Sequence, residues 1–178
     1  MRLRLGLWLT GFAAVALFVA LSVLDGRLHE TGGPGIIPFE LAGELARARE
    51  ILADWGAAGR DTARLSLWLD FAFLVAYGGF LALAATAARD MALRRGWRRL
   101  AAARGLVVAL PVGAAALDVL ENIFLLATVG AHGGATSPRL AAICATGKFA
   151  LVIATLAYIL AVLARAATSA RRPTEPAG

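Results

Sequence analysis

Cysteine and histidine are scarce in this chain of 178 residues, and their positions argue against a metal centre. Cys144 is the only cysteine, and the two histidines, His29 and His132, fall in different predicted loops. A zinc or haem site needs several such ligands gathered on facing elements. We therefore expect no metal and no cofactor, and a single cysteine excludes an intramolecular disulfide.

Recognised motifs of catalysis and nucleotide binding are missing as well. The chain has no glycine-rich phosphate loop and no Gly-x-Ser-x-Gly turn. Its net charge is +6, but the arginines gather at the borders of apolar runs and at the chain ends. We therefore expect no nucleic-acid partner. The sequence assigns no catalytic residues, which stay unknown.

Lysine is almost absent: 17 of the 18 basic residues are arginine, and Lys148 is the exception. The arginine bias is typical of a GC-rich bacterial genome. Arginine keeps its proton in proteins, whereas a buried lysine can lose it. The lone lysine lies inside an apolar run, which suggests that the size or permanent charge of arginine does not suit that position.

Long apolar runs are what the chain has in abundance, with 60% hydrophobic residues and a mean hydropathy of +0.72. Four runs, at about 5–24, 67–88, 106–129 and 140–164, each reach the ~20 residues of a spanning helix. Backbone groups in lipid must be paired within the segment, which favours helices. The prediction is an all-α membrane protein, a four-transmembrane-helix bundle in one domain, 1–166. Residues 167–178 are expected to form a disordered cytoplasmic tail.

The distribution of arginine predicts the topology. The segment 89–104 holds six arginines against one acid, and the C-terminal tail adds more. The positive-inside rule then places both termini in the cytoplasm of a multi-pass protein of the bacterial inner membrane. The first run is longer than the core of a signal peptide, so we expect it to be retained. The arginine-rich segment either only sets topology or also contacts anionic lipid through Arg94, Arg95, Arg98 and Arg99.

An amphipathic extracytoplasmic helix is predicted at about 38–56, between the first and second spans. Pro38 suits the first turn of a helix. Apolar side chains then recur at helical spacing on one side, namely Leu41, Leu45, Ala48, Leu52 and Trp55. This helix lies either on the outer membrane surface or over the mouth of the bundle.

Polar residues interrupt the second, third and fourth runs. In the third run Asp118, Glu121 and Asn122 project from one helix face, because they are three and four residues apart. Glu121 and Lys148 lie at the same predicted depth in antiparallel spans, which favours an ion pair. The second run would place Asp70 above Glu121 and Tyr77 beside Asp118. The predicted buried polar cluster is Asp70, Tyr77, Asp118, Glu121, Asn122 and Lys148.

Charge counting within this cluster leaves the function open. Three carboxylates against one ammonium are costly in a low-dielectric site, so at least one acid is protonated or a cation is bound. The leading hypothesis is that the cluster stabilises the helix bundle or binds a partner, either a membrane subunit or a second copy of the chain. The alternatives are a small proton- or cation-coupled transporter and an intramembrane enzyme acting on a lipid or lipid-linked substrate.

Overall fold

The computed structural model describes residues 2–102 and 105–170, and this part of the chain is helical throughout apart from its connections. The helices are α1 (Arg2–Glu30), α2 (Ile36–Glu40), α3 (Leu45–Arg94), α4 (Arg98–Ala101), α5 (Leu106–Val129) and α6 (Ser137–Ala170). Four of them, α1, α3, α5 and α6, are long and apolar enough to cross a membrane. The prediction of an all-α fold with four helices long and apolar enough to span a membrane is therefore confirmed.

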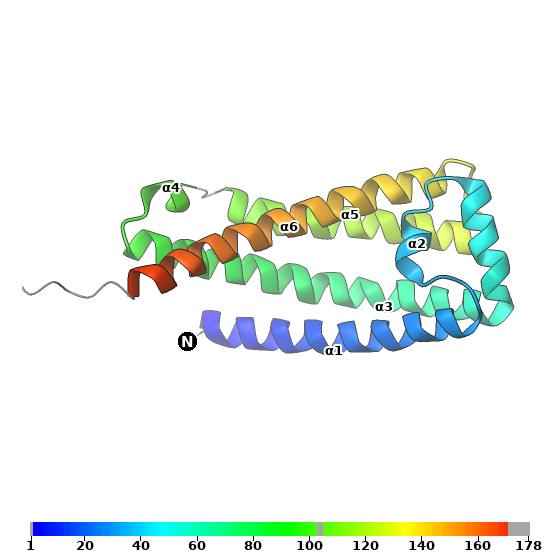
Figure 1. The fold of residues 1–178 in the computed structure, drawn as a ribbon, viewed down its shortest axis with the longest axis horizontal. Helices are drawn as coiled ribbons and strands as arrows, with labels where there is room; N and C mark the ends of the chain where they lie inside the picture. The colour runs from blue at the N-terminus through cyan, green and yellow to red at the C-terminus, as the bar shows by residue number, and fades with distance from the viewer. Residues whose placement is uncertain (1, 103–104, 171–178) are drawn as a thin grey trace, which may run out of the picture.

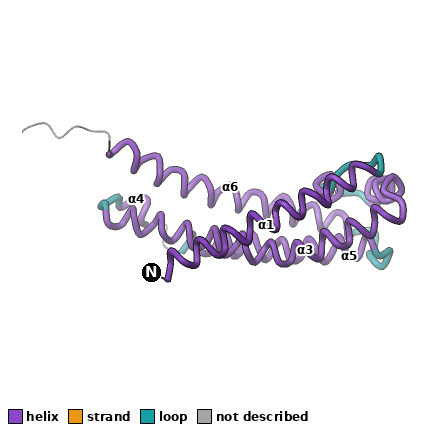
Figure 2. Tube along the Cα trace, turned by 90° about the horizontal axis from the view of Figure 1, so that it is seen from below, coloured by secondary structure: helices purple, strands orange, loops and turns teal. Residues whose placement is uncertain are grey.

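The four long helices lie side by side along one axis (Figure 1). α3 is central: it packs against α1 on one side and against α5 and α6 on the other, and α5 packs along α6. One end of the bundle carries the start of α1, α4 and the end of α6, and we call it the terminal end. The opposite end carries α2 and the start of α3, and we call it the α2 end. Figure 2 shows α6 diverging from α1 toward the terminal end.

Two of the predicted boundaries need correction. α6 continues to Ala170, so residues 167–170 are helical and do not belong to a disordered tail. The hydroxyls of Thr168 and Ser169 both donate to the carbonyl of Arg165, which satisfies polar groups within the last helical turns. The remainder of the predicted tail, 171–178, lies outside the described residues. The second run, predicted to end at about 88, belongs to a helix that continues to Arg94, and α4 follows it.

The segment 38–56 is not the single helix that the apolar spacing predicts. α2 ends at Glu40, and the chain is non-helical until α3 begins at Leu45. α3 then contains a break at Gly56, whose φ of 62° and ψ of −162° glycine adopts far more easily than other residues. This break redirects the chain, so the first turns of α3 cross the α2 end steeply (Figure 1). Apolar spacing alone does not reveal where a helix changes direction.

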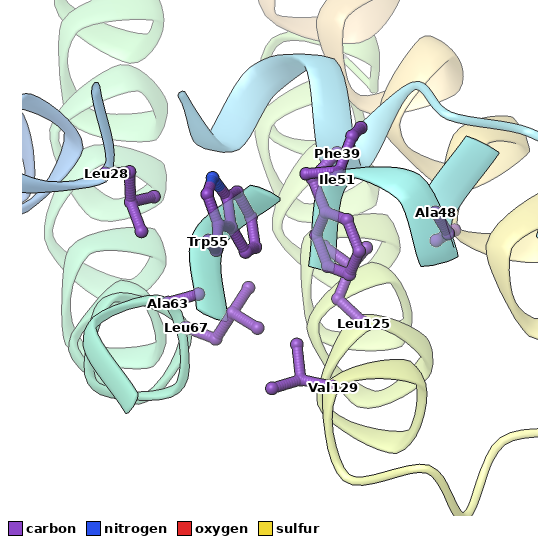
Figure 3. Close-up of a cluster of buried hydrophobic side chains, with 10 residues drawn as sticks. Leu28, Phe39, Ala48, Ile51, Trp55, Ala63, Leu67, Leu125 and Val129 are labelled. Atoms are coloured by element: carbon purple, nitrogen blue, oxygen red, sulfur yellow. The ribbon is translucent and has the colours of Figure 1, made fainter. Parts of the chain in front are cut away.

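A compact apolar core holds the α2 end together (Figure 3). The Trp55 ring is 2% exposed and lies 5.0 Å, centroid to centroid, from the ring of Phe39. Its Nε1 donates to the carbonyl of Pro34 at 2.6 Å, which ties the start of α3 to the segment before α2. Leu28 from α1 and Leu125 from α5 complete the contact. This core fixes α2 over the end of the bundle.

Candidate functional site

Lys148 of α6 is the centre of a buried charged cluster. Its Nζ donates to Asp118 Oδ1 at 2.9 Å and lies 2.8 Å from Glu121 Oε2. Both carboxyls come from one face of α5, and they are 1% and 0% exposed. A third carboxyl oxygen, Glu40 Oε2 of α2, lies 3.9 Å from the same ammonium. The matched depth of Glu121 and Lys148 in the sequence therefore corresponds to a direct ion pair in the structure.

Helix α3 supplies two further polar groups to this cluster. The Tyr77 hydroxyl donates to Asp118 Oδ2 at 2.7 Å. Asp70 Oδ2 accepts a hydrogen bond of 2.7 Å from Asn122 Nδ2, so its partner is the amide that follows Glu121 rather than Glu121 itself. The structure thus brings together all six residues singled out in the sequence, and they link α3, α5 and α6.

Glu40 is the member of the cluster that sequence reasoning missed. It belongs to the segment predicted as an outer amphipathic helix, where an acid is expected to face water. The one available signal was local: Glu40 is the single charged residue in the apolar stretch from Ile36 to Ala42. Its side chain is 12% exposed, because α2 folds inward over the end of the bundle.

The cluster has an excess of acid over base. Lys148 is the cation beside four carboxyls, those of Glu40, Asp70, Asp118 and Glu121, which would leave a charge of −3 if all were ionised. Glu121 Oε2 lies 2.8 Å from the Lys148 ammonium, and neither oxygen of Glu121 has a hydrogen-bond partner within the described part of the chain. A buried group of this kind is stable only if some carboxyls carry protons or a further cation is present.

A cavity of about 540 Å³ adjoins the cluster. It is lined by side chains of α1, α3 and α6, by Asp118 of α5, and by α2 at the α2 end. It is partly open, and over the described residues α1 and α6 are not packed against one another. Figure 1 looks onto this side of the bundle, where α3 is visible between α1 and α6. The charged side chains on its wall are Asp25, Glu40, Asp70, Asp118 and Lys148.

Metal binding has no support from the geometry of the described residues. No group of three or more histidine, cysteine, aspartate or glutamate side chains converges there in the way that a metal ion requires. The cluster is held instead by Lys148, Tyr77 and Asn122, which donate to its carboxyls. Such an arrangement can exchange protons or accept the hydrogen-bond donors of a cationic molecule.

No family model, no curated protein and no solved structure matches this chain. The function therefore has to be argued from the geometry of the site.

The stability of the protein should depend on pH through Glu40. Burial raises the pKa of this carboxyl above its ordinary value of 4.5, and the nearby carboxyls of Asp118 and Asp25 add to the rise. The ammonium of Lys148 opposes it. Because the folded state holds the proton more tightly, stability is lost as the pH rises from about 4.5 through the raised pKa. Glu40→Gln, which stays neutral, should lose less stability over that range.

Unfolding of the purified protein at a series of pH values checks this expectation. The matched control is Glu44→Gln, which changes an exposed glutamate four residues further along the chain and should follow the wild-type curve. Parallel curves for the wild type and Glu40→Gln would mean that Glu40 is not a proton-binding group of the folded state.

Proposed function

We propose that the protein binds a cation in exchange for protons at the acid-rich cavity, as a small transporter does. The observation that carries the proposal is the combination of four buried or partly buried carboxyls around one ammonium with an adjoining cavity of about 540 Å³. Intramembrane carboxyl groups commonly mark proton relays and ion pathways. A cation that enters here would replace protons on the carboxyls.

The competing function is purely structural. The chain of contacts from Tyr77 through Asp118 to Lys148 joins α3, α5 and α6, and hydrogen bonds between helices stabilise bundles modestly. A structural role alone, however, would be served by matched charges in a closed interior. The excess of carboxyls and the partly open cavity favour ligand binding. An intramembrane enzyme has weaker support, because no activated nucleophile adjoins these groups in the described residues.

The proposed setting is the bacterial inner membrane with both termini in the cytoplasm. The support is the arginine content of the terminal end, where Arg94, Arg95, Arg98 and Arg99 lie close to α4. In this orientation the α2 end and the start of α3 are extracytoplasmic. Ala48, Ile51 and Trp55 there face the core, whereas Arg47 and Glu50 are exposed. The cavity would then receive its ligand from the outer half of the bilayer or from the outer surface.

Proton release on cation binding tests the proposal. Purified protein in weakly buffered nonionic detergent is titrated with ammonium, methylammonium and tetramethylammonium, and released protons are followed with a pH indicator. The wild type should release protons with at least one of these cations, because a bound cation stabilises ionised carboxyls. Asp118→Asn and Asp70→Asn should each reduce the release.

Asp61→Asn is the control, because Asp61 is exposed and outside the cluster, and it should behave as the wild type. Circular dichroism and size-exclusion chromatography establish that each variant is folded. If the folded wild type releases no protons with any of the three cations, the structural role is preferred and the proposal fails.

A further inference from the structure

The cavity is amphipathic along the axis of the bundle. The lining of each long helix is charged toward the α2 end and apolar toward the terminal end. On α1, Asp25 lies nearer the α2 end and Phe18 lies nearer the terminal end. On α3 the order is Asp70 and then Phe80, and on α6 it is Lys148 and then Val152. At ~1.5 Å per residue Phe18 and Phe80 lie roughly 10–15 Å from Asp25 and Asp70 along their helices. The apolar part continues roughly 6 Å past Asp118 and Lys148, to Leu81 and Val152. The cavity thus has a charged part near the α2 end, which we call the head site, and an apolar part toward the terminal end, which we call the slot.

The head site favours a positive charge. Its wall carries four acids against Lys148, and the ammonium of Lys148 is already engaged by Asp118 and Glu121. Asn122 donates to only one carboxyl oxygen of Asp70, so the other oxygen can bind a ligand. The contact of Glu40 with Lys148 is long, with 3.9 Å between Oε2 and Nζ. Glu121 is fully buried and lies 2.8 Å from the Lys148 ammonium, so it shares that cation with Asp118 behind the cavity wall. An anionic head would meet uncompensated repulsion.

Aromatic rings line the slot next to these acids. The Phe73 and Tyr77 ring centroids are 5.1 Å apart, and Phe18 approaches Phe73 at 6.4 Å. The Phe149 ring already contacts a cation, because the Lys148 ammonium lies 5.0 Å from its centroid. Aromatic faces attract amines and quaternary ammonium groups in desolvated sites. The rings therefore suit a cation that is attached to an apolar body.

We infer that the ligand is a cationic amphiphile, an amine or quaternary ammonium with a hydrocarbon tail, whose head binds the acids at the α2 end and whose tail lies between α1 and α6. This inference rests on the proposed cation-binding function and adds the ligand class to it. The partly open side between α1 and α6 gives the tail a route from the surrounding lipid. The volume of about 540 Å³ lies within the range of small-molecule sites.

Binding of radiolabelled dodecylamine to the immobilised protein tests the inference. The measurement is made in nonionic maltoside detergent, with laurate as the anionic probe of equal chain length and bare resin as the blank. Dodecylamine should bind saturably and roughly tenfold or more tightly than laurate, as expected for one charge-assisted hydrogen bond. Its binding should weaken at low pH, where protons compete for the carboxyls, and should fall about tenfold in Asp70→Asn.

A pair of adjacent substitutions on α6 locates the binding. Val152→Trp fills the slot and should abolish binding, whereas Ile153→Trp, at a position 65% exposed and outside the cavity wall, should leave it unchanged. Equal affinity for laurate would overturn the charge selectivity, and binding that survives Val152→Trp would overturn the location. If small cations release protons but dodecylamine does not bind saturably, the proposed function stands and the amphiphile inference fails.

Discussion

Replacing Lys148 by methionine is expected to lower the free energy of unfolding by about 3–5 kcal/mol, the usual cost of removing one partner from a buried ion pair. Lys148 Nζ lies within 3.0 Å of two carboxyl oxygens, on Asp118 and Glu121, and both residues are at most 1% exposed. Without the ammonium these carboxyls and Glu40 repel one another in a medium that solvates charge poorly. The measurement is chemical or thermal unfolding of the purified variant in detergent.

The double variant Glu121→Gln, Lys148→Met separates pairing from packing. It should be more stable than Lys148→Met alone, because the charge that Glu121 would leave unpaired is gone. Comparison with the two single variants then gives the coupling free energy between residues 121 and 148. Ile153→Met is the control on the same helix, since that side chain is 65% exposed. A Lys148→Met variant as stable as the wild type at neutral pH would show that the carboxyls are protonated without the lysine and that the ion pair contributes little.

Trp55→Ala is expected to destabilise the protein by about 3–5 kcal/mol, as large-to-small substitutions of buried aromatic residues do. The ring is 2% exposed, packs on Phe39 at 5.0 Å between centroids, and donates its indole proton to Pro34. Its loss should also release α2, which holds Glu40 near Lys148. Backbone hydrogen exchange of residues 36–44 should therefore accelerate more than exchange in the middle of α5.

Two tryptophan variants serve as controls for this result. Trp55→Phe keeps most of the packing but removes the hydrogen bond to Pro34, so it should cost only about 1 kcal/mol. Trp68→Ala removes a side chain that is 62% exposed on the outside of the bundle and should change stability little. Similar losses of unfolding free energy for Trp55→Ala and Trp68→Ala would mean that the core at the α2 end does not stabilise the fold.

Fold class followed from the sequence for a direct physical reason. Hydrocarbon requires paired backbone groups and apolar side chains, so four runs of sufficient length predict helices whatever their neighbours are. The polar cluster was predictable in the same way, because helix periodicity puts Asp118 and Glu121 on one face. Antiparallel packing of α5 and α6 then places Lys148 at their level. These inferences use only local spacing and depth.

The rest depended on long-range packing that no local pattern encodes. The turn at Gly56 and the core of Trp55 and Phe39 fold α2 inward, which brings Glu40 to Lys148. The cavity likewise exists because α1 and α6 both pack against α3 but do not pack against each other. The sequence by itself determined the four spans and, inside them, three acids and the lysine of the cluster. Each of these features is a property of one helix or of one pair of adjacent helices. Only the tertiary structure decided the fourth carboxyl and the cavity, because both are set by the angles at which separate helices meet.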